Sequence, residues 1–279
     1  MIAALDADRP AIEAFLKQHI ATSMFPLSNL RRFGMAGGHA RAMRFWLRWQ
    51  AGWLTDVLGV SQEGIVFPQC PTGCWGDAKV ILQGRNVKGI LGDATQVAGL
   101  RAVLALSGDP GLDEIEPLYA LSLNDLVVPD VTGFRLVPLE DAPRKLVVGW
   151  RRAYLQEVMP MPGEDLAMTA VKDIVGYISA DTHRVLYDGT TPVAMTGFNA
   201  VLPEAVQIGG VYTPPALRGR GQARRAVALH LAQARASGVE TASLFAASPQ
   251  ACTAYEAIGF RRMGDFRILI YQAPQVIYG

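Results

Sequence analysis

The sequence predicts an α/β protein with two domains. Short apolar or alternating runs bounded by Gly and Pro indicate strands, and apolar residues that recur every three or four positions between them indicate helices. A length of 279 residues suits two domains of ordinary size or one large domain.

The first half begins with a predicted helix and continues with short strands. Asp8 can cap a helix over residues 8–20, in which Pro10 suits the first turn, and residues 24–30 and 34–38 are predicted to be irregular. We expect strands at 45–49, 53–60, 64–68, 79–82 and 89–92, followed by a helix over 94–106. Residues 108–130, rich in Pro, Asp and Glu, are expected to be a connector with short strands at 119–123 and 126–128. The predicted domains are therefore 1–130 and 131–279.

The second half alternates strands and helices more regularly. Strands are expected at 134–139, 183–187, 192–200, 205–212, 241–246 and 265–271. Helices are expected at 141–158, 165–178, 222–237 and 249–258, with a break of the chain over 159–165.

Composition excludes several functional classes. The chain has 26 Lys and Arg against 25 Asp and Glu, 50% hydrophobic residues and 3 Cys. It is too apolar for a disordered protein, too neutral for a dedicated nucleic-acid binder, and too poor in Cys for a disulfide scaffold. No apolar run reaches the length of a membrane span, and Asp6, Asp8 and Arg9 interrupt any signal-peptide core. We expect a cytoplasmic protein that binds neither membrane nor nucleic acid.

The cysteines do not predict a metal site. Cys70 and Cys74 form a C-x3-C pair with no second pair and no nearby His, whereas a zinc site usually combines two close pairs. We expect a loop with two free thiols and no bound metal.

The most informative segment follows the strand 205–212. It reads Arg218-Gly-Arg-Gly-Gln-Ala223 and leads into the helix 222–237. The N–H groups at a helix N-terminus are unpaired and the helix dipole adds positive potential there, while glycines let an anion approach the backbone. Arg218, Arg220, Arg224 and Arg225 concentrate positive charge in eight residues of a near-neutral chain. This pattern predicts a site for a small anionic ligand such as a pyrophosphate. The spacing matches neither a Walker loop nor a Rossmann loop.

The same segment resembles the GNAT superfamily of acetyl-CoA-dependent N-acyltransferases. Arg218 to Ala223 fits the family loop Q/R-x-x-G-x-G/A, and Tyr255 to Phe260 fits the family ending Y-x-x-x-G-F. The resemblance covers about residues 132–272 and implies a mixed central sheet flanked by helices. The chain departs from the family where an Asn often opens the last helix, because Ser248 stands there.

The resemblance implies acetyl-CoA as co-substrate, no metal, and a set of binding residues. Backbone groups of the strand before the loop would pair with the pantetheine arm, and the N–H of Val211 would stabilise the developing oxyanion. The loop would bind the pyrophosphate, and Ser248 would cap the last helix or bond the pantetheine arm. The implied cofactor-binding residues are Val211, Tyr212, Thr213, Arg218, Gly219, Arg220, Gly221, Gln222, Ala223 and Ser248. Arg224 and Arg225 either reach the 3′-phosphate of CoA or form a solvated helix face.

The catalytic residues are expected to include a general acid and a base. Tyr255 matches the family's general acid, which protonates the departing thiolate. The identity of the general base stays open. Gln207 stands where the resemblance would place an acidic residue, Glu204 is the nearest carboxylate, and His183 is a further candidate. A backbone carbonyl with ordered water would suffice for an amine that binds neutral.

The expected activity is transfer of acetyl from acetyl-CoA to a primary amine of a small molecule or amino acid, by a monomer or homodimer. The alternatives are a catalytically weak CoA-binding regulatory module and an acyltransferase for longer chains. The first half lacks the loop motif and is interpreted as a degenerate GNAT-like repeat, with an unrelated α/β domain as the alternative.

Overall fold

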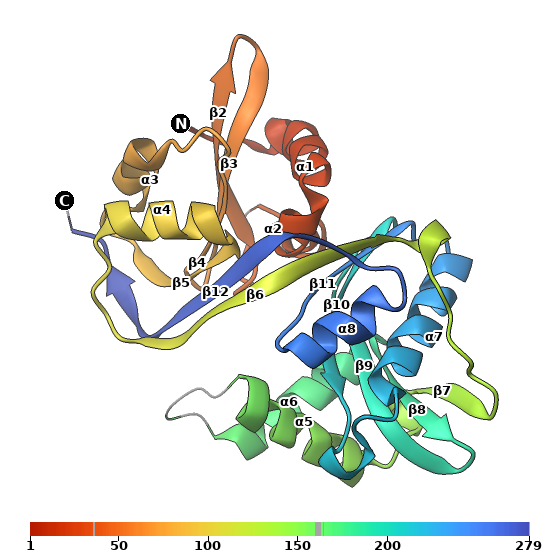
Figure 1. Cartoon of the computed structure of the whole chain (residues 1–279). Coiled ribbons are helices and arrows are strands. Elements are labelled where there is room, and N and C mark those ends of the chain that lie inside the picture. Colours follow the sequence, from red (N-terminus) through yellow and green to blue (C-terminus); the bar gives the residue numbers. More distant parts are fainter. Residues whose placement is uncertain (36, 160–162, 164, 279) are drawn as a thin grey trace. The chain divides into compact units, whose positions relative to one another are not determined.

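The computed structural model describes residues 1–278 except 36, 160–162 and 164, so most of the expected break at 159–165 lies outside the described residues. The chain divides into two compact units, one of Met1–Glu116 with Gly264–Gly279 and one of Pro117–Met263 (Figure 1). Among the described residues, no helix has the length and apolar character needed to cross a lipid bilayer.

The first unit is a mixed sheet with helices on its faces. Its helices are α1 (Arg9–Gln18), α2 (Ile20–Phe33), α3 (Trp75–Leu82) and α4 (Ala94–Leu104). Its strands are β1 (Ile2–Ala3), β2 (Met43–Gln50), β3 (Trp53–Ser61), β4 (Ile65–Gln69), β5 (Asn86–Asp93), the start of β6 (Pro110–Ser122) and most of β12 (Arg261–Val276). They follow the order β1-β2-β3-β4-β5-β12-β6, and β4 and β5 are parallel. Leu82 of α3 and Leu100 of α4 share a core with Leu58 and Ile90 of the sheet.

The second unit repeats this arrangement. Its strands are the end of β6, β7 (Phe134–Pro138), β8 (His183–Asp188), β9 (Thr191–Val201), β10 (Ala205–Tyr212) and β11 (Thr241–Phe245), and its helices are α5 (Arg144–Val158), α6 (Leu166–Ser179), α7 (Gln222–Ala236) and α8 (Pro249–Glu256). The order is β6-β11-β10-β9-β8-β7; β10 and β11 are parallel and the other pairs are antiparallel.

Two separate cores show which helices cover each face of this second sheet. Ile208 of β10 packs with Val227 of α7 and Tyr255 of α8, whereas Tyr212 packs with Trp150 of α5 and Ile174 of α6. Helices α7 and α8 therefore cover one face, and α5 and α6 the other. The α/β class with a mixed sheet is confirmed.

Three predicted segments differ from the structure. Residues 20–33 form α2 with Pro26 inside it, because burial of Met24, Leu27 and Leu30 outweighs the local preference for a loop. Residues 79–82 belong to α3 and not to a strand, since Ala78 and Leu82 are buried one helical turn apart.

The third difference is β6, which replaces most of the expected connector. Asp113 lies inside this strand because Arg267 of β12 and Arg101 of α4 pair with it, at 2.7 and 2.8 Å. A continuous strand over 110–122 leaves no linker there, and residues 126–128 form no strand. The observed units accordingly divide after Glu116, earlier than the predicted 130, and residues 264–279 go with the first unit.

Candidate functional site

Strand β10 loses its neighbour β11 halfway along its length. The parallel pairing runs from Ala205 opposite Thr241 to Ile208 opposite Leu244, and in the described structure the later residues of β10 have no partner on β11. The pairing with β9 also shifts between Gly209 and Tyr212, where Gly210 has φ +63°. A left-handed residue in a bulge suits glycine. The end of β10 thus offers backbone groups to an added extended chain.

A row of free N–H groups follows at the start of α7. Across the described residues, the N–H groups of 219–224 donate no hydrogen bond to the protein. Gly219 and Gly221 have φ +76° and +75°, conformations that other residues adopt at a cost of about 1–2 kcal/mol. A Cβ on Gly219 would meet no protein atom within 4 Å, so this part of the loop faces open space. The geometry fits an anion at the N-terminus of α7.

Buried polar atoms without a protein partner gather at the same place. Considering the described residues, they include Thr213 Oγ1, Gln222 Oε1 and Arg224 Nε. Buried polar groups are normally hydrogen-bonded, so atoms of this kind indicate a polar ligand or water. Together with the free N–H groups, they fit a phosphate-bearing cofactor.

The arginines in and next to the loop make different contacts. Arg218 donates to Glu157 Oε2 at 2.6 Å and to the carbonyl oxygen of Thr213 at 2.9 Å, which fixes the loop against α5. Arg225 donates to the carbonyl oxygens of Asp130 and Arg220, at 2.8 and 2.7 Å, so its guanidinium supports the loop from within. Of the two arginines considered for the 3′-phosphate, only Arg224 has a buried nitrogen without a partner among the described residues.

Glu157 is a site residue that the sequence did not reveal. It precedes Arg218 by 61 positions, and its Oε1 also lies 3.5 Å from the hydroxyl of Tyr212. Burial, followed by the Glu157 carboxylate, raises the pKa of Tyr212. No local signal marks Glu157, because its partner comes from a distant loop.

Tyr255 and Ser248 lie on and next to α8. Tyr255 is buried in the core that also receives Val211 from β10, so it lies on the α7 and α8 face of the sheet beside this strand. Ser248 Oγ accepts a hydrogen bond from the N–H of Ala251 at 3.2 Å, so it caps α8. Of the two roles expected for Ser248, the structure shows the cap.

The candidate bases are less well placed. Glu204 precedes β10 at the end where β10 and β11 are paired, about 23 Å of strand away from Val211 at about 3.3 Å per residue. Glu204 thus lies at the opposite end of β10 from Val211, and its role as the base stays a prediction. His183 is fully buried and stacks on Tyr177, and burial moves its pKa well below its ordinary value, which makes it a weak proton acceptor.

Gln207 is buried on β10, and its Oε1 has no partner among the described residues. It offers a neutral amide in place of a carboxylate.

Comparisons with known proteins agree with this geometry. Residues 152–260 match the acetyltransferase (GNAT) family. Three solved structures share the fold over almost the whole chain. A Drosophila protein has a TM-score of 0.62 and 12% identity, with 97% of this chain and 98% of that one covered. A GCN5-related N-acetyltransferase from Sphaerobacter thermophilus has a TM-score of 0.56 and 14% identity, with coverage of 99% and 96%. A tandem GNAT protein from the clavulanic acid biosynthesis pathway has a TM-score of 0.54 and 12% identity, with coverage of 98% of both chains. No curated protein matches the sequence.

Proposed function

Because residues 152–260 form an acetyltransferase domain of the GNAT family, we propose that this protein is a cytoplasmic enzyme that transfers acetyl from acetyl-CoA to a primary amine of a small molecule or amino acid. The transfer is a direct attack in a ternary complex. The observation that carries the proposal is the row of unpaired N–H groups over residues 219–224, set at the end of a strand whose partner has ended.

The loop and the free strand end hold the co-substrate. The N–H groups of Gly219 to Ala223 donate to the pyrophosphate, and the dipole of α7 and the Arg224 guanidinium favour its charge. The backbone of Val211 to Thr213 pairs with the amide groups of the pantetheine arm, as an added strand would. Arg218 is a positioning residue, because its bonds to Glu157 and Thr213 connect the loop to α5.

Two groups of the chain act on the reacting atoms. Acetyl-CoA supplies a thioester, whose carbonyl carbon the amine nitrogen attacks and whose C–S bond then breaks. The N–H of Val211 donates to the carbonyl oxygen as negative charge develops there. The phenol of Tyr255 gives its proton to the departing thiolate, and the proton lost by the amine goes to water.

The test is an acetylation assay with a broad panel of amines, in which release of the CoA thiol is followed. The expected result is thiol release that depends on an amine, with the acetylated amine identified by mass. If the protein binds CoA but no amine accelerates thiol release, the regulatory module becomes the better description. An acetylated form of the enzyme itself would contradict direct attack. Longer acyl-CoA thioesters in the same assay test the acyl chain.

A further inference from the structure

Asp56, Cys70 and Cys74 come together inside the first unit. Asp56 lies on β3, Cys70 directly follows β4, and Cys74 directly precedes α3. One carboxylate oxygen and the two Sγ atoms all lie within 4.8 Å of one another. The three residues are 0%, 1% and 6% exposed. Two thiols and a carboxylate thus share one buried place.

The carboxylate of Asp56 is held in position by its neighbours. Oδ1 accepts from the N–H of Thr72 at 2.9 Å, and Oδ2 accepts from the hydroxyls of Thr72 and Thr55 at 2.7 and 2.9 Å. A carboxylate has about four acceptor positions. The three bonds fix its orientation and leave one position on Oδ1, as is usual for a carboxylate that binds a metal and is itself hydrogen-bonded.

The two thiols interact with each other, and Arg48 also interacts with Cys74. Cys70 Sγ lies 3.7 Å from the carbonyl oxygen of Val57, and Cys74 Sγ lies 3.8 Å from Met1 Sδ. The two sulfur atoms therefore already face one shared space, beside the Asp56 carboxylate. Zinc binds thiolate sulfur at about 2.3 Å and carboxylate oxygen at about 2.0–2.2 Å, so the ligand atoms of a tetrahedral site lie about 3.6–3.8 Å apart. Since the three atoms here lie within 4.8 Å of one another, side-chain movements of about 1 Å or less bring them to one ion.

We propose that Asp56, Cys70 and Cys74 bind a thiophilic divalent cation of the zinc class. Two thiolates and a carboxylate carry three buried negative charges, which a divalent ion largely neutralises. Binding releases the thiol protons to the solvent and forms two metal–sulfur bonds and one metal–oxygen bond. Three protein ligands leave the fourth tetrahedral position for a water molecule.

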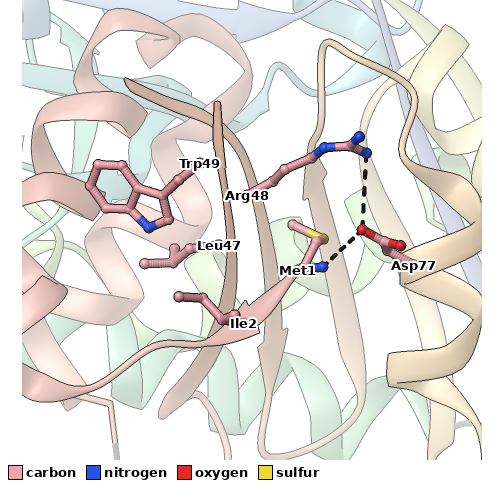
Figure 2. A pocket seen from close by; sticks show the side chains of 6 residues that line it. All are labelled: Met1, Ile2, Leu47, Arg48, Trp49 and Asp77. Carbon is pink, nitrogen blue, oxygen red and sulfur yellow. Dashed lines mark hydrogen bonds and ion pairs between the residues drawn. The ribbon is translucent and has the colours of Figure 1, made fainter. Parts of the chain in front are cut away.

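A pocket lies beside this cluster. It has a volume of about 270 Å³ and is lined by Met1, Ile2, Leu47, Arg48, Trp49 and Asp77 (Figure 2). Figure 2 shows the Met1 nitrogen and the Arg48 guanidinium directed at the same oxygen of the Asp77 carboxylate, at 2.8 and 3.9 Å. Met1 links pocket and cluster, since its sulfur contacts Cys74.

The experiment titrates the full chain with Cd²⁺ after reduction, treatment with a chelator and removal of both reagents under nitrogen. Charge-transfer absorption of the cadmium–thiolate bonds reports binding, and Zn²⁺ is then used to displace Cd²⁺. The expected result is saturation at one equivalent. Cys70→Ser and Cys74→Ser each lower the plateau absorption by about half or more and raise the dissociation constant at least tenfold, as expected for loss of a ligand.

Two further variants separate this site from adventitious thiol binding. Cys252→Ser is the matched control, because Cys252 is the remaining cysteine and lies on α8 of the second unit; it should leave the titration unchanged. Asp56→Asn should keep the thiolate absorption and raise the Zn²⁺ dissociation constant at least tenfold. Circular dichroism of each metal-free variant checks the fold. Cys74→Ser and Asp56→Asn change different ligands, so if one variant misfolds, the other still tests the metal site.

Several results would overturn the proposal. The reduced wild type could show no saturable binding of Cd²⁺, or it could bind two equivalents independently. Cys252→Ser could have the same effect as Cys70→Ser, or Asp56→Asn could keep the Zn²⁺ affinity of the wild type. A reduced protein that takes no metal but forms a Cys70–Cys74 disulfide in air would show a redox pair instead.

Discussion

Replacing Gly219 by alanine tests the anion loop with the smallest added group. Gly219 has φ +76°, and an added Cβ would meet no protein atom within 4 Å. The substitution therefore creates no clash in the protein, but it penalises the left-handed conformation by about 1–2 kcal/mol. The methyl group also points into the open space that the N–H groups need for an anion.

The free-energy cost of the left-handed conformation should appear as weaker binding of CoA. With alanine in place of Gly219, the loop of the free protein can relax, and binding must restore the strained conformation. Gly219→Ala is therefore expected to raise the dissociation constant of CoA about 5- to 30-fold, the ratio that corresponds to about 1–2 kcal/mol. Isothermal titration with CoA measures this change, and urea unfolding measures any cost to stability.

Gly238→Ala is the matched control at the other end of α7. Gly238 has φ +95°, and a Cβ there would also meet nothing within 4 Å. The same backbone strain should lower the stability of the protein and leave CoA binding unchanged. The reasoning is refuted if Gly219→Ala binds CoA like the wild type, or if Gly238→Ala weakens CoA binding to the same extent.

Three other predictions concern the acid, the loop and pH. Tyr255→Phe should lower kcat at least tenfold with little change in the KM for acetyl-CoA. Tyr119→Phe removes a 2.7 Å bond to Glu256 and a contact with Cys252, and it should keep kcat. Equal losses of kcat in steady-state assays would contradict the role of Tyr255. Glu157→Gln removes the charge partner of Arg218 and should raise the KM for acetyl-CoA about 2- to 5-fold, as suits a half-exposed pair; an unchanged KM would show that this pair does not position the loop. Burial lowers the pKa of His230 to about 3, so between pH 6.5 and 3 the unfolded chain binds a proton that the folded protein does not, and stability falls as pH falls. His230→Gln should flatten this loss by up to about 1.4 kcal/mol per pH unit in urea unfolding, and an equal slope in both proteins would disprove it.

Much of the second unit could be predicted because its signals are local. Strand β10 has the predicted residues, Ala205–Tyr212, since it is a run of apolar residues and glycines between turn residues. Helix α7 begins at Gln222 as predicted, directly after a glycine whose positive φ sets its start. The loop between them also follows from its residues, because free N–H groups and left-handed glycines are properties of a short stretch of backbone.

Other elements depend on contacts that the local sequence does not contain. Pro26 favours a break, yet the surrounding helix persists because three of its apolar side chains are fully covered by the rest of the unit. Asp113 and its proline-rich surroundings suggest a connector, yet a strand forms because Arg267, more than 150 positions later, neutralises the carboxylate. Long-range burial and charge pairing override local propensity in both cases.

By itself, the sequence determined the α/β class, the glycine- and arginine-rich loop from Arg218 to Ala223 and the family that this loop indicates. These features need only neighbouring residues, because backbone conformation and hydrophobic period are set within one or two turns of chain. The tertiary structure decided which side chains meet: Glu157 with Arg218, and Asp56 with the two thiols that the sequence left without a third ligand. These contacts depend on how elements that are distant in the sequence pack together, so no local sequence pattern predicts them.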